Sequence, residues 1–404
     1  MGSLASSPET VVPLAGSVDR GDKPIHVAQI VDSLVTGGAE RLIVTFVEAA
    51  QRRTDLKVSV IVLADDRTPL RDDLERFDVE IVALPHRSLA DPRRLWRMIL
   101  EIRQRRIDLL HAHLSTAIIM GGLSALALRL PLVATIHNTK PSVRRVGRAR
   151  AWLHRYVLRR RANRLIAVGE AVVTTNAEEA GNRPFDVVHN AVSRAAVGAE
   201  DQAQDARAEL GIAPDALLLI AVGSLIPQKA HDDLLKAFAR VRRQRPDARL
   251  LIVGAGPLED DLRELLTSLE LESSAALLGL RTDVPRLLAA SDMFVSASHW
   301  EGTPVALLEA MVNHLPCVVT DVGDNRLLLG DTGNIAVPAE APYELAAAIV
   351  DLASEPERMK ACGQAAGSRA TSAVGVDAWL DRLVSIYRHE IACGGSPIVL
   401  PEAA

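Results

Sequence analysis

Two glutamates, Glu301 and Glu309, form the pattern in this chain with the clearest chemical meaning. The apolar run at 293–297 predicts a buried strand that leads toward them. Thr303 and Pro304 predict a helix start, because threonine is a good N-cap and proline fits the first helical position. Glu301 then lies in the strand-to-helix loop. Glu309 lies on the second helical turn, roughly 7–8 Å along the axis from the helix start.

Between the two carboxylates lie the first N–H groups of the expected helix, on Val305 and Ala306. Free N–H groups and the helix dipole make this position favourable for an anion. This order places an anion-binding site between two carboxylates. It suits a ligand with hydroxyls at both ends and phosphates in the middle. A nucleotide sugar has that form.

Two further stretches combine turn residues with groups that bind phosphate. The glycines of Thr36-Gly37-Gly38-Ala39-Glu40 follow the first predicted strand, and they allow close backbone approach at a helix N-terminus. A tight turn would need the same glycines, so both interpretations stay open. Lys229 precedes a helix predicted to begin near His231. There it can meet a diphosphate as a point charge, and an ordinary surface lysine is the alternative.

Three histidines lie on consecutive predicted strands or at their ends. His111 and His113 alternate along one strand and face the same side. No third ligand lies at zinc-binding spacing, so we expect packed or hydrogen-bonded structural roles for both. His137 ends the next strand, where a polar residue is more often functional, and a capping or core role is the alternative.

The acidic residues do not form a metal-binding triplet. No D-x-D sequence occurs, and Glu259-Asp-Asp261 is predicted to be the solvated first turn of a helix. We therefore expect no bound metal and no cofactor.

Strand ends must position these residues. Short apolar runs alternate with amphipathic stretches through both halves of the chain, which predicts parallel sheets covered by helices on both faces. Two Rossmann-like α/β lobes would then hold a ligand in the cleft between them, at the carboxyl ends of the strands. The predicted strands are 25–31, 58–63, 80–84, 109–113, 133–137, 164–168 and 187–189 in the first half, and 217–222, 249–253, 276–278, 293–296, 317–320 and 335–337 in the second.

Length and charge support two units. A chain of 404 residues favours two domains, and 48% hydrophobic with 3% aromatic residues is ample for two aliphatic cores. Residues 23–193 carry 27 Lys and Arg against 18 Asp and Glu, whereas residues 194–404 carry 18 against 30. We place the first domain at 23–193, a linker at 193–204 and the second domain at 194–376.

The ends of the chain are interpreted separately. Residues 1–22 predict a disordered tail, because they lack the basic and apolar regions of a signal peptide. An amphipathic helix at 377–391, within a segment 377–393, is expected at the other end. Cys317, Cys362 and Cys393 are far apart, which favours a reducing, cytoplasmic compartment without disulfides. The sequence contains no run of about 18 apolar residues, so it predicts no membrane span.

Residues 142–164 contain nine arginines interleaved with aromatic and aliphatic residues. Trp152, Tyr156 and Arg159 recur at three-to-four spacing, which is typical of a basic amphipathic helix on an anionic membrane surface, here the inner membrane face. An ordinary surface helix is the alternative. Nucleic acid is disfavoured as a partner, because the other half of the chain is acidic.

Together these stretches resemble glycosyltransferase family 4, whose members are retaining enzymes with the GT-B fold. The resemblance covers about residues 24–390, and its most specific marker is the E-x7-E motif of Glu301 and Glu309. Supporting matches are Gly37-Gly38-Ala39-Glu40, Thr135-Ile-His-Asn138, residues 222–229 and residues 315–323.

The resemblance implies transfer of a sugar from a nucleotide-diphosphate sugar to a glycan, lipid-linked or small-molecule acceptor. Glu301 would bind sugar hydroxyls, Glu309 ribose hydroxyls and Lys229 the departing diphosphate. His137 would contact the sugar near its anomeric centre, and the backbone around Leu280 and Arg281 would meet the base. The same resemblance places Gly37, Gly38, Ser224, Arg281, Gly302, Thr303, Pro304 and Val305 at the donor. The final helix would cross back to the first lobe.

The chain departs from the family pattern at the diphosphate. Ser224 stands where an arginine is frequent, and a hydroxyl cannot replace a guanidinium charge. Ala230 replaces a frequent glycine, and the sequence Asn190-Ala-Val-Ser193 replaces a frequent Asn-Gly-x-Asp. A sugar-nucleotide epimerase and a non-catalytic sugar-nucleotide-binding protein are the alternative functions. Polysaccharide or cell-envelope synthesis is the expected context, and a soluble natural product is the alternative acceptor.

Overall fold

The protein is described here from a computed structural model. The described residues are 23–35, 37–64, 68–84, 91–139, 147–193, 196–198, 202–373 and 375–394. The predicted tail at 1–22, Thr36 of the glycine motif and residues 142–146 of the arginine-rich segment lie outside them. The linker predicted at 193–204 lies partly outside them and stays a prediction.

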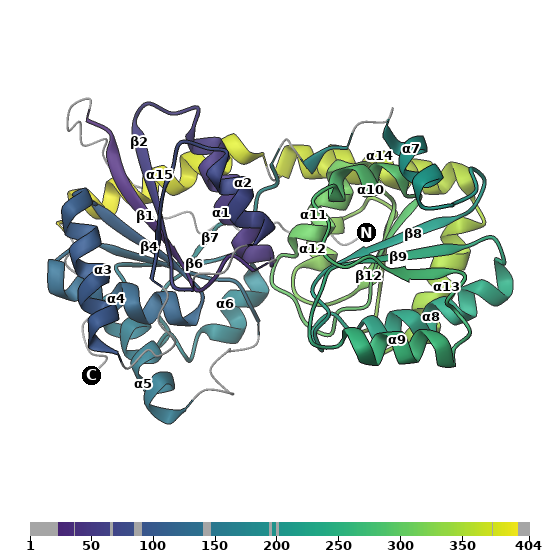
Figure 1. Cartoon of the computed structure of the whole chain (residues 1–404), viewed down its shortest axis with the longest axis horizontal. Coiled ribbons are helices and arrows are strands. Elements are labelled where there is room, and N and C mark those ends of the chain that lie inside the picture. Colours follow the sequence, from purple (N-terminus) through teal and green to yellow (C-terminus); the bar gives the residue numbers. More distant parts are fainter. Residues whose placement is uncertain are drawn as a thin grey trace, which may run out of the picture.

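Two parallel sheets form two lobes, which lie side by side in Figure 1. The first sheet has the strand order β3-β2-β1-β4-β5-β6-β7, and the second has the order β10-β9-β8-β11-β12-β13. The strands of the first sheet are β1 (Ile25–Val31), β2 (Leu56–Val62), β3 (Glu80–Ala83), β4 (Leu109–His113), β5 (Leu132–Ile136), β6 (Arg164–Ala167) and β7 (Asp186–Val187). Those of the second are β8 (Leu218–Val222), β9 (Arg249–Val253), β10 (Ala275–Leu277), β11 (Met293–Ser296), β12 (Cys317–Thr320) and β13 (Ile335–Val337).

Each predicted strand is present, and the predicted parallel pairing is confirmed. Six strands have the predicted bounds, and the others differ by one or two residues at one or both ends. β2 begins at Leu56, two residues early, because Leu56 pairs with Ile25 of β1. His189 was predicted in a strand but follows β7, which ends at Val187.

Both faces of each sheet are buried, as the continuous apolar runs predict. Val27 and Val31 of β1 belong to one apolar cluster, and Ala28 and Ile30 belong to another. Because side chains alternate along a strand, these two clusters lie on opposite faces. β8 shows the same alternation.

Helices form the outer layers of both lobes. In the first lobe they are α1 (Gly38–Ala50), α2 (Pro69–Glu75), α3 (Pro92–Arg105), α4 (Ser115–Leu128), α5 (Arg148–Tyr156) and α6 (Glu170–Asn176). In the second they are α7 (Ala203–Glu209), α8 (His231–Gln244), α9 (Glu259–Ser268), α10 (Val284–Ala290), α11 (Val305–Val312), α12 (Asn325–Leu329), α13 (Pro342–Ala353) and α14 (Pro356–Ala373).

The last helix, α15 (Val376–Ala392), returns to the first lobe, where it is drawn in yellow in Figure 1. Its apolar face packs on α1. The Phe46 ring meets the ring edges of Trp379 and Tyr387 at 6.0 and 6.2 Å between centroids. Tyr387 is fully buried in the core of the first lobe. The chain therefore crosses between the lobes a second time before it ends.

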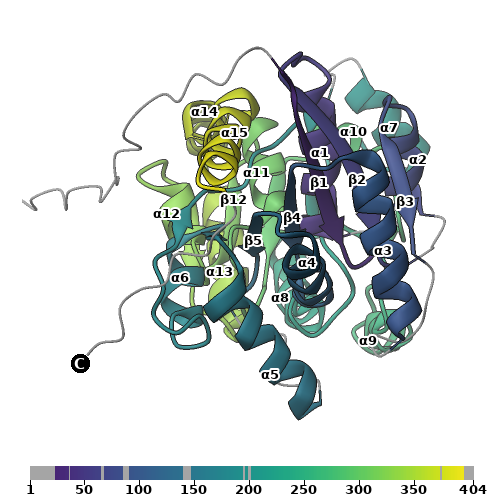
Figure 2. The ribbon, with the colours of Figure 1, turned by 90° about the vertical axis from the view of Figure 1, so that its left-hand side faces the viewer.

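The arginine-rich segment is less uniform than a basic amphipathic helix. α5 passes into a π-helical turn at Val157–Arg161, and the two together project from the first lobe in Figure 2. Several arginines of this segment bind protein, and two examples are Arg161 and Arg164. Arg161 is buried and donates to the Ala125 carbonyl, and Arg164 lies on β6 and pairs with Asp186. No helix among the described residues is long and apolar enough to cross a membrane.

Candidate active site

An interlobe cleft lies at the carboxyl ends of the strands where the strand order of each sheet reverses. In the first lobe this is the point between β1 and β4, and in the second it is the point between β8 and β11. Ligands bind at such points in open parallel sheets, because the loops on either side diverge and leave a crevice. The cleft has an empty volume of about 1520 Å³, part of which is open to solvent.

The cleft brings together every site residue expected from the sequence. Three come from the first lobe and ten from the second. They are Gly37, Gly38 and His137, and then Ser224, Lys229, Leu280, Arg281, Glu301, Gly302, Thr303, Pro304, Val305 and Glu309. Residues more than 250 positions apart in sequence therefore line one cavity.

Glu301 is held in the loop after β11. Glu301 is only 5% exposed. One of its carboxylate oxygens, Oε1, accepts hydrogen bonds from Lys229 Nζ at 2.5 Å and from Ser298 Oγ at 2.7 Å. The other oxygen accepts from Gln228 at 3.4 Å. Lys229 reaches Glu301 from the loop before α8, which begins at His231 as predicted. A buried carboxylate needs such partners, because an unpaired charge is costly there.

The start of α11 differs from the expectation. The helix begins at Val305 with Pro304 as its cap, one residue later than predicted, and Thr303 makes no capping bond. The Thr303 hydroxyl instead donates to the Val168 carbonyl in the first lobe. Contact between the lobes therefore outweighs local capping. The N–H groups of Val305 and Ala306 still belong to the first turn, where no intrahelical acceptor exists.

The N-termini of α1 and α11 face each other across the cleft. A β-carbon added to Gly38 would lie 3.6 Å from Cγ2 of Val305. A β-carbon on Gly302 would lie 2.4 Å from the His137 carbonyl oxygen, so only glycine allows this approach of the lobes. Two sets of helix N–H groups therefore border one space, which strengthens the preference for an anion.

Arg41 is a cleft residue that no sequence motif predicted. Its Nε lies 3.5 Å from Oε1 of Glu309, across the cleft. Glu309 is only 7% exposed, and burial raises the pKa of its carboxyl group while the nearby guanidinium acts to lower it. The only feature of the sequence that places Arg41 near the cleft is its position one helical turn after Gly38.

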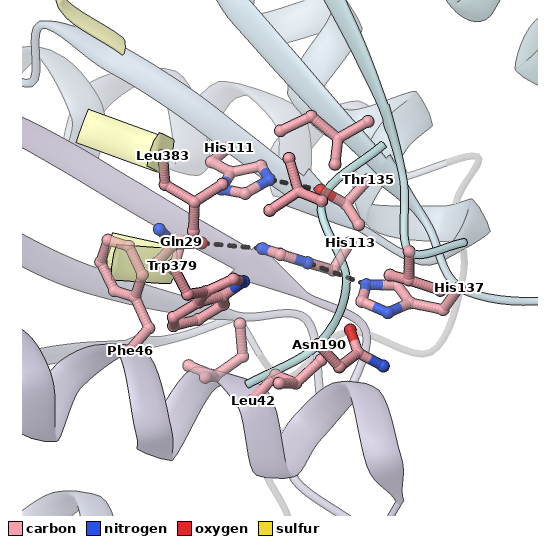
Figure 3. A pocket seen from close by; sticks show the side chains of 14 residues that line it. Gln29, Leu42, Phe46, His111, His113, Thr135, His137, Asn190, Trp379 and Leu383 are labelled. Atoms are coloured by element: carbon pink, nitrogen blue, oxygen red, sulfur yellow. Dashed lines mark hydrogen bonds between the residues drawn. The ribbon is translucent and has the colours of Figure 1, made fainter. Parts of the chain in front are cut away.

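A buried hydrogen-bond network reaches His137 through Gln29 and His113 (Figure 3). His113 lies between Gln29 and His137, with Nε2 at 2.8 Å from the Gln29 carbonyl oxygen and Nδ1 at 3.0 Å from His137 Nε2. Gln29 donates from Nε2 to the Tyr387 hydroxyl at 3.2 Å, and this hydroxyl lies 2.7 Å from His111 Nδ1. The structural, hydrogen-bonded roles expected for His111 and His113 are confirmed.

This network fixes the proton positions on the rings. The Gln29 carbonyl oxygen only accepts, so His113 donates from Nε2 and accepts at Nδ1. His137 must then donate from Nε2, which leaves its Nδ1 as an acceptor for a ligand hydroxyl.

Burial keeps these rings neutral, because it disfavours the charged form. It lowers the pKa of His137 to about 4 and that of His111 to about 3. The pKa of His113 is well below its ordinary value for the same reason.

Two further polar contacts between the lobes were not predicted. Asp324 accepts from the backbone N–H groups of Glu170 and Ala171, at 3.1 Å each, and so caps α6 from the other lobe. Asn190 donates to the Thr303 carbonyl at 2.6 Å. No sequence pattern marks such pairs, because each partner is an ordinary loop or cap residue.

Both lobes match known protein families. Residues 36–195 match the family described as Glycosyltransferase Family 4, and residues 202–369 match Glycosyl transferases group 1. A D-inositol 3-phosphate glycosyltransferase of Segniliparus rotundus is 30% identical over 311 residues, which cover 72% of this chain and 68% of that protein. The chain belongs to glycosyltransferase family 4.

This family 4 glycosyltransferase has further relatives with different substrates in their names. One is the UDP-Gal:alpha-D-GlcNAc-diphosphoundecaprenol alpha-1,3-galactosyltransferase of Escherichia coli, 29% identical over 64% of this chain and 70% of that protein. Another is the alpha-D-kanosaminyltransferase of Streptomyces kanamyceticus, 27% identical over 80% of this chain and 86% of that protein.

Solved structures give the fold of the glycosyltransferase. Anabaena HepE with UDP-glucose has a TM-score of 0.80 at 21% identity, over 90% of this chain and 99% of that one. WaaG, a glycosyltransferase of lipopolysaccharide biosynthesis, has a TM-score of 0.70 at 16% identity, over 89% and 99%. The predicted GT-B fold, with two Rossmann-like lobes, is confirmed.

Proposed function

We propose that this glycosyltransferase takes its sugar from a nucleotide-diphosphate sugar and transfers it with retention of anomeric configuration. The observation that carries the proposal is the arrangement around α11. Glu301 and Glu309 bracket its N-terminus inside the cleft, with Lys229 beside Glu301. This is the order of hydroxyl, phosphate and hydroxyl partners that such a donor requires.

Each group has a distinct role in the proposed reaction. Glu301 accepts hydrogen bonds from sugar hydroxyls, and Glu309 accepts them from the ribose. As the bond between sugar and diphosphate breaks, negative charge grows on the phosphate oxygens, and Lys229 and the α11 amides stabilise it. The acceptor oxygen forms the new bond and loses its proton to the departing diphosphate. Fixed groups lower the barrier by position and charge.

Neutral His137 completes the sugar site in this proposal. Its Nδ1 is an acceptor, so it binds a hydroxyl of the transferred sugar without adding positive charge near the anomeric carbon. We also propose transfer without a metal ion, because the sequence lacks a D-x-D triplet. Equal transfer rates with and without EDTA would agree with this, and loss of transfer that Mg²⁺ restores would contradict it.

A panel of donors, scored by nucleotide release, tests the donor proposal. With the accepted donor, Lys229→Ala and Glu309→Ala should each lower transfer about tenfold or more, because each removes a group that contacts the donor. Unchanged transfer in both variants would contradict the assigned roles. NMR of the donor incubated without acceptor would detect the isomerised sugar that an epimerase forms. Absence of turnover with every acceptor would favour a non-catalytic sugar-nucleotide-binding protein.

For the acceptor we propose a lipid-linked glycan at the cytoplasmic face of the membrane. The support is a patch on α5, where the rings of Trp152 and Tyr156 stack at 5.8 Å and are 63% and 39% exposed. Arg148, Arg155 and Arg160 are exposed around them. Aromatic rings beside cations suit an anionic bilayer surface. The E. coli relative named above also uses a diphosphoundecaprenol-linked acceptor.

Vesicle co-sedimentation tests this surface. The protein should bind vesicles with anionic lipids at low salt, and replacement of both Trp152 and Tyr156 by alanine should release it. No binding by the unaltered protein would contradict the membrane proposal and favour a soluble acceptor.

A further inference from the structure

Three cationic side chains line the described part of the cleft, and they differ in how firmly they are held. Lys229 is held by Glu301 at 2.5 Å. Arg281 makes two parallel bonds to Asp283, at 2.7 Å each. Both sets of distances are those of charge-assisted hydrogen bonds, about 2.7–2.9 Å or shorter.

Arg41 is held differently. Its guanidinium lies 3.5 Å from Glu309 and 3.8 Å from Asp73, and its side chain is 30% exposed. These distances exceed those of a charge-assisted hydrogen bond, so the contacts are loose ion pairs. Arg41 is therefore the cation in the cleft that can change partner at least cost.

Arg41 lies beside the anion-binding site at the N-terminus of α11. Gly38 and Val305 face each other where the N-termini of α1 and α11 meet. Arg41 lies three residues further along α1, about 4.5 Å along the helix axis, on the same side as Gly38. An anion at the Val305 N–H group would thus lie next to the guanidinium.

The charge of the cleft gives a reason for an exchange of partners. Its lining carries four acidic side chains, on Glu40, Asp73, Glu301 and Glu309, against the three cations, and burial raises the pKa of Glu40 to about 7. Each of the three cations already has a carboxylate partner, so an incoming diphosphate gains a phosphate-binding cation only if one of them changes partner. When ribose hydroxyls hydrogen-bond to Glu309, that carboxylate no longer needs Arg41, which is then free for the phosphates.

We propose that donor binding moves Arg41 from Glu309 to the diphosphate, so that the first lobe supplies the second phosphate-binding cation beside Lys229. This rests on the proposed donor class. It gives Arg41 a fork of donors toward phosphate oxygens, which a lysine or a serine lacks. Because Arg41 belongs to the first lobe and Lys229 to the second, the diphosphate then bridges the lobes.

Calorimetric titration of the full chain with UDP and with GDP tests this inference. With the nucleotide that the unaltered protein binds, Arg41→Gln should weaken binding about tenfold or more, and Arg41→Lys should be intermediate. Arg97→Gln is the matched control, since Arg97 lies on α3 outside the cleft with a half-exposed side chain. It should bind like the unaltered protein. Thermal melting verifies that Arg41→Gln is folded.

A second titration separates phosphate binding from a structural role. The corresponding nucleoside, followed by NMR, should bind the unaltered protein and Arg41→Gln equally, because it has no phosphate. Equal loss of nucleoside and nucleotide binding would overturn the inference, as would unchanged nucleotide binding in Arg41→Gln. If the unaltered protein binds no nucleoside diphosphate, the proposed donor class itself fails. If it binds one and Arg41→Gln binds it equally, only the role of Arg41 fails.

Discussion

At the scale of single residues, the site depends on charges and rings that burial would destabilise without partners. Glu301 is stabilised by Lys229 and Ser298, and Glu309 by Arg41. The histidines avoid the cost of a buried charge because they stay neutral. Their lowered pKa values couple the protonation of the site to the stability of the fold.

The first prediction concerns stability at acidic pH. His111 and His137 have pKa values of about 3 and about 4 in the folded chain, below the value of about 6.5 expected when unfolded. Between these values the unfolded chain binds more protons. The free energy of unfolding should therefore fall as pH drops below about 6.5, by up to about 1.4 kcal/mol per pH unit for each histidine.

Denaturant unfolding at several pH values between 7.5 and 4.5, roughly the window set by these pKa values, measures this slope. His137→Asn should reduce the slope, because one depressed histidine is removed. His389→Asn, at a position near the end of α15, is the control and should leave it unchanged. Equal slopes in all three proteins would show that His137 titrates normally in the folded chain.

At the scale of secondary structure, α15 contributes to the site as well as to the core. Tyr387 hydrogen-bonds with Gln29 of β1 and His111 of β4, and Gln29 in turn orients His113 and His137. A helix from the end of the chain thus determines which ring nitrogen of His137 accepts.

The second prediction tests this support. Tyr387→Phe should lower the free energy of unfolding by about 1–3 kcal/mol, because it leaves buried polar groups of Gln29 and His111 without their partner. Transfer should slow by roughly threefold to tenfold in kcat, with a smaller change in donor KM, since the His137 tautomer is less firmly fixed. Tyr343→Phe, at an exposed position on α13, is the matched control. Unchanged kcat in a less stable Tyr387→Phe protein would limit the network to a structural role.

At the scale of the whole molecule, polar contacts across the cleft hold the two lobes together. Asp324 caps α6, Asn190 donates to Thr303, and Thr303 donates to Val168. Contacts of this kind are weaker than a packed core, so relative motion of the lobes is expected. The proposed donor site requires the two lobes to lie together, because His137 and Glu301 belong to different lobes.

The third prediction follows from the cap on α6. Asp324→Ala should leave two backbone N–H groups of α6 without their acceptor and favour the open form. We expect donor KM to rise about fivefold, with a larger radius of gyration in small-angle scattering. Asp331→Ala, at an exposed loop position, should change neither quantity. A normal radius together with a normal KM in Asp324→Ala would show that this contact does not control closure.

The sequence by itself determined the strands, the two-lobe architecture, the family and the residues around α11. These follow from local information, because apolar runs, turn glycines and the spacing of Glu301 and Glu309 are set within short stretches of chain. The parallel topology then brings strand ends together, which explains why Gly38, His137 and Lys229 line one cleft.

Only the tertiary structure decided the pairings between distant residues. Arg41 beside Glu309, Asp324 on α6, and the line from Tyr387 to His137 each join segments more than 100 residues apart. It also decided that Thr303 bonds to the other lobe instead of capping α11. Such choices depend on which surfaces meet when two lobes close, and periodicity or propensity in one stretch carries no information about them. The physical reason is that a buried polar group takes whichever partner the packed fold places within hydrogen-bond distance.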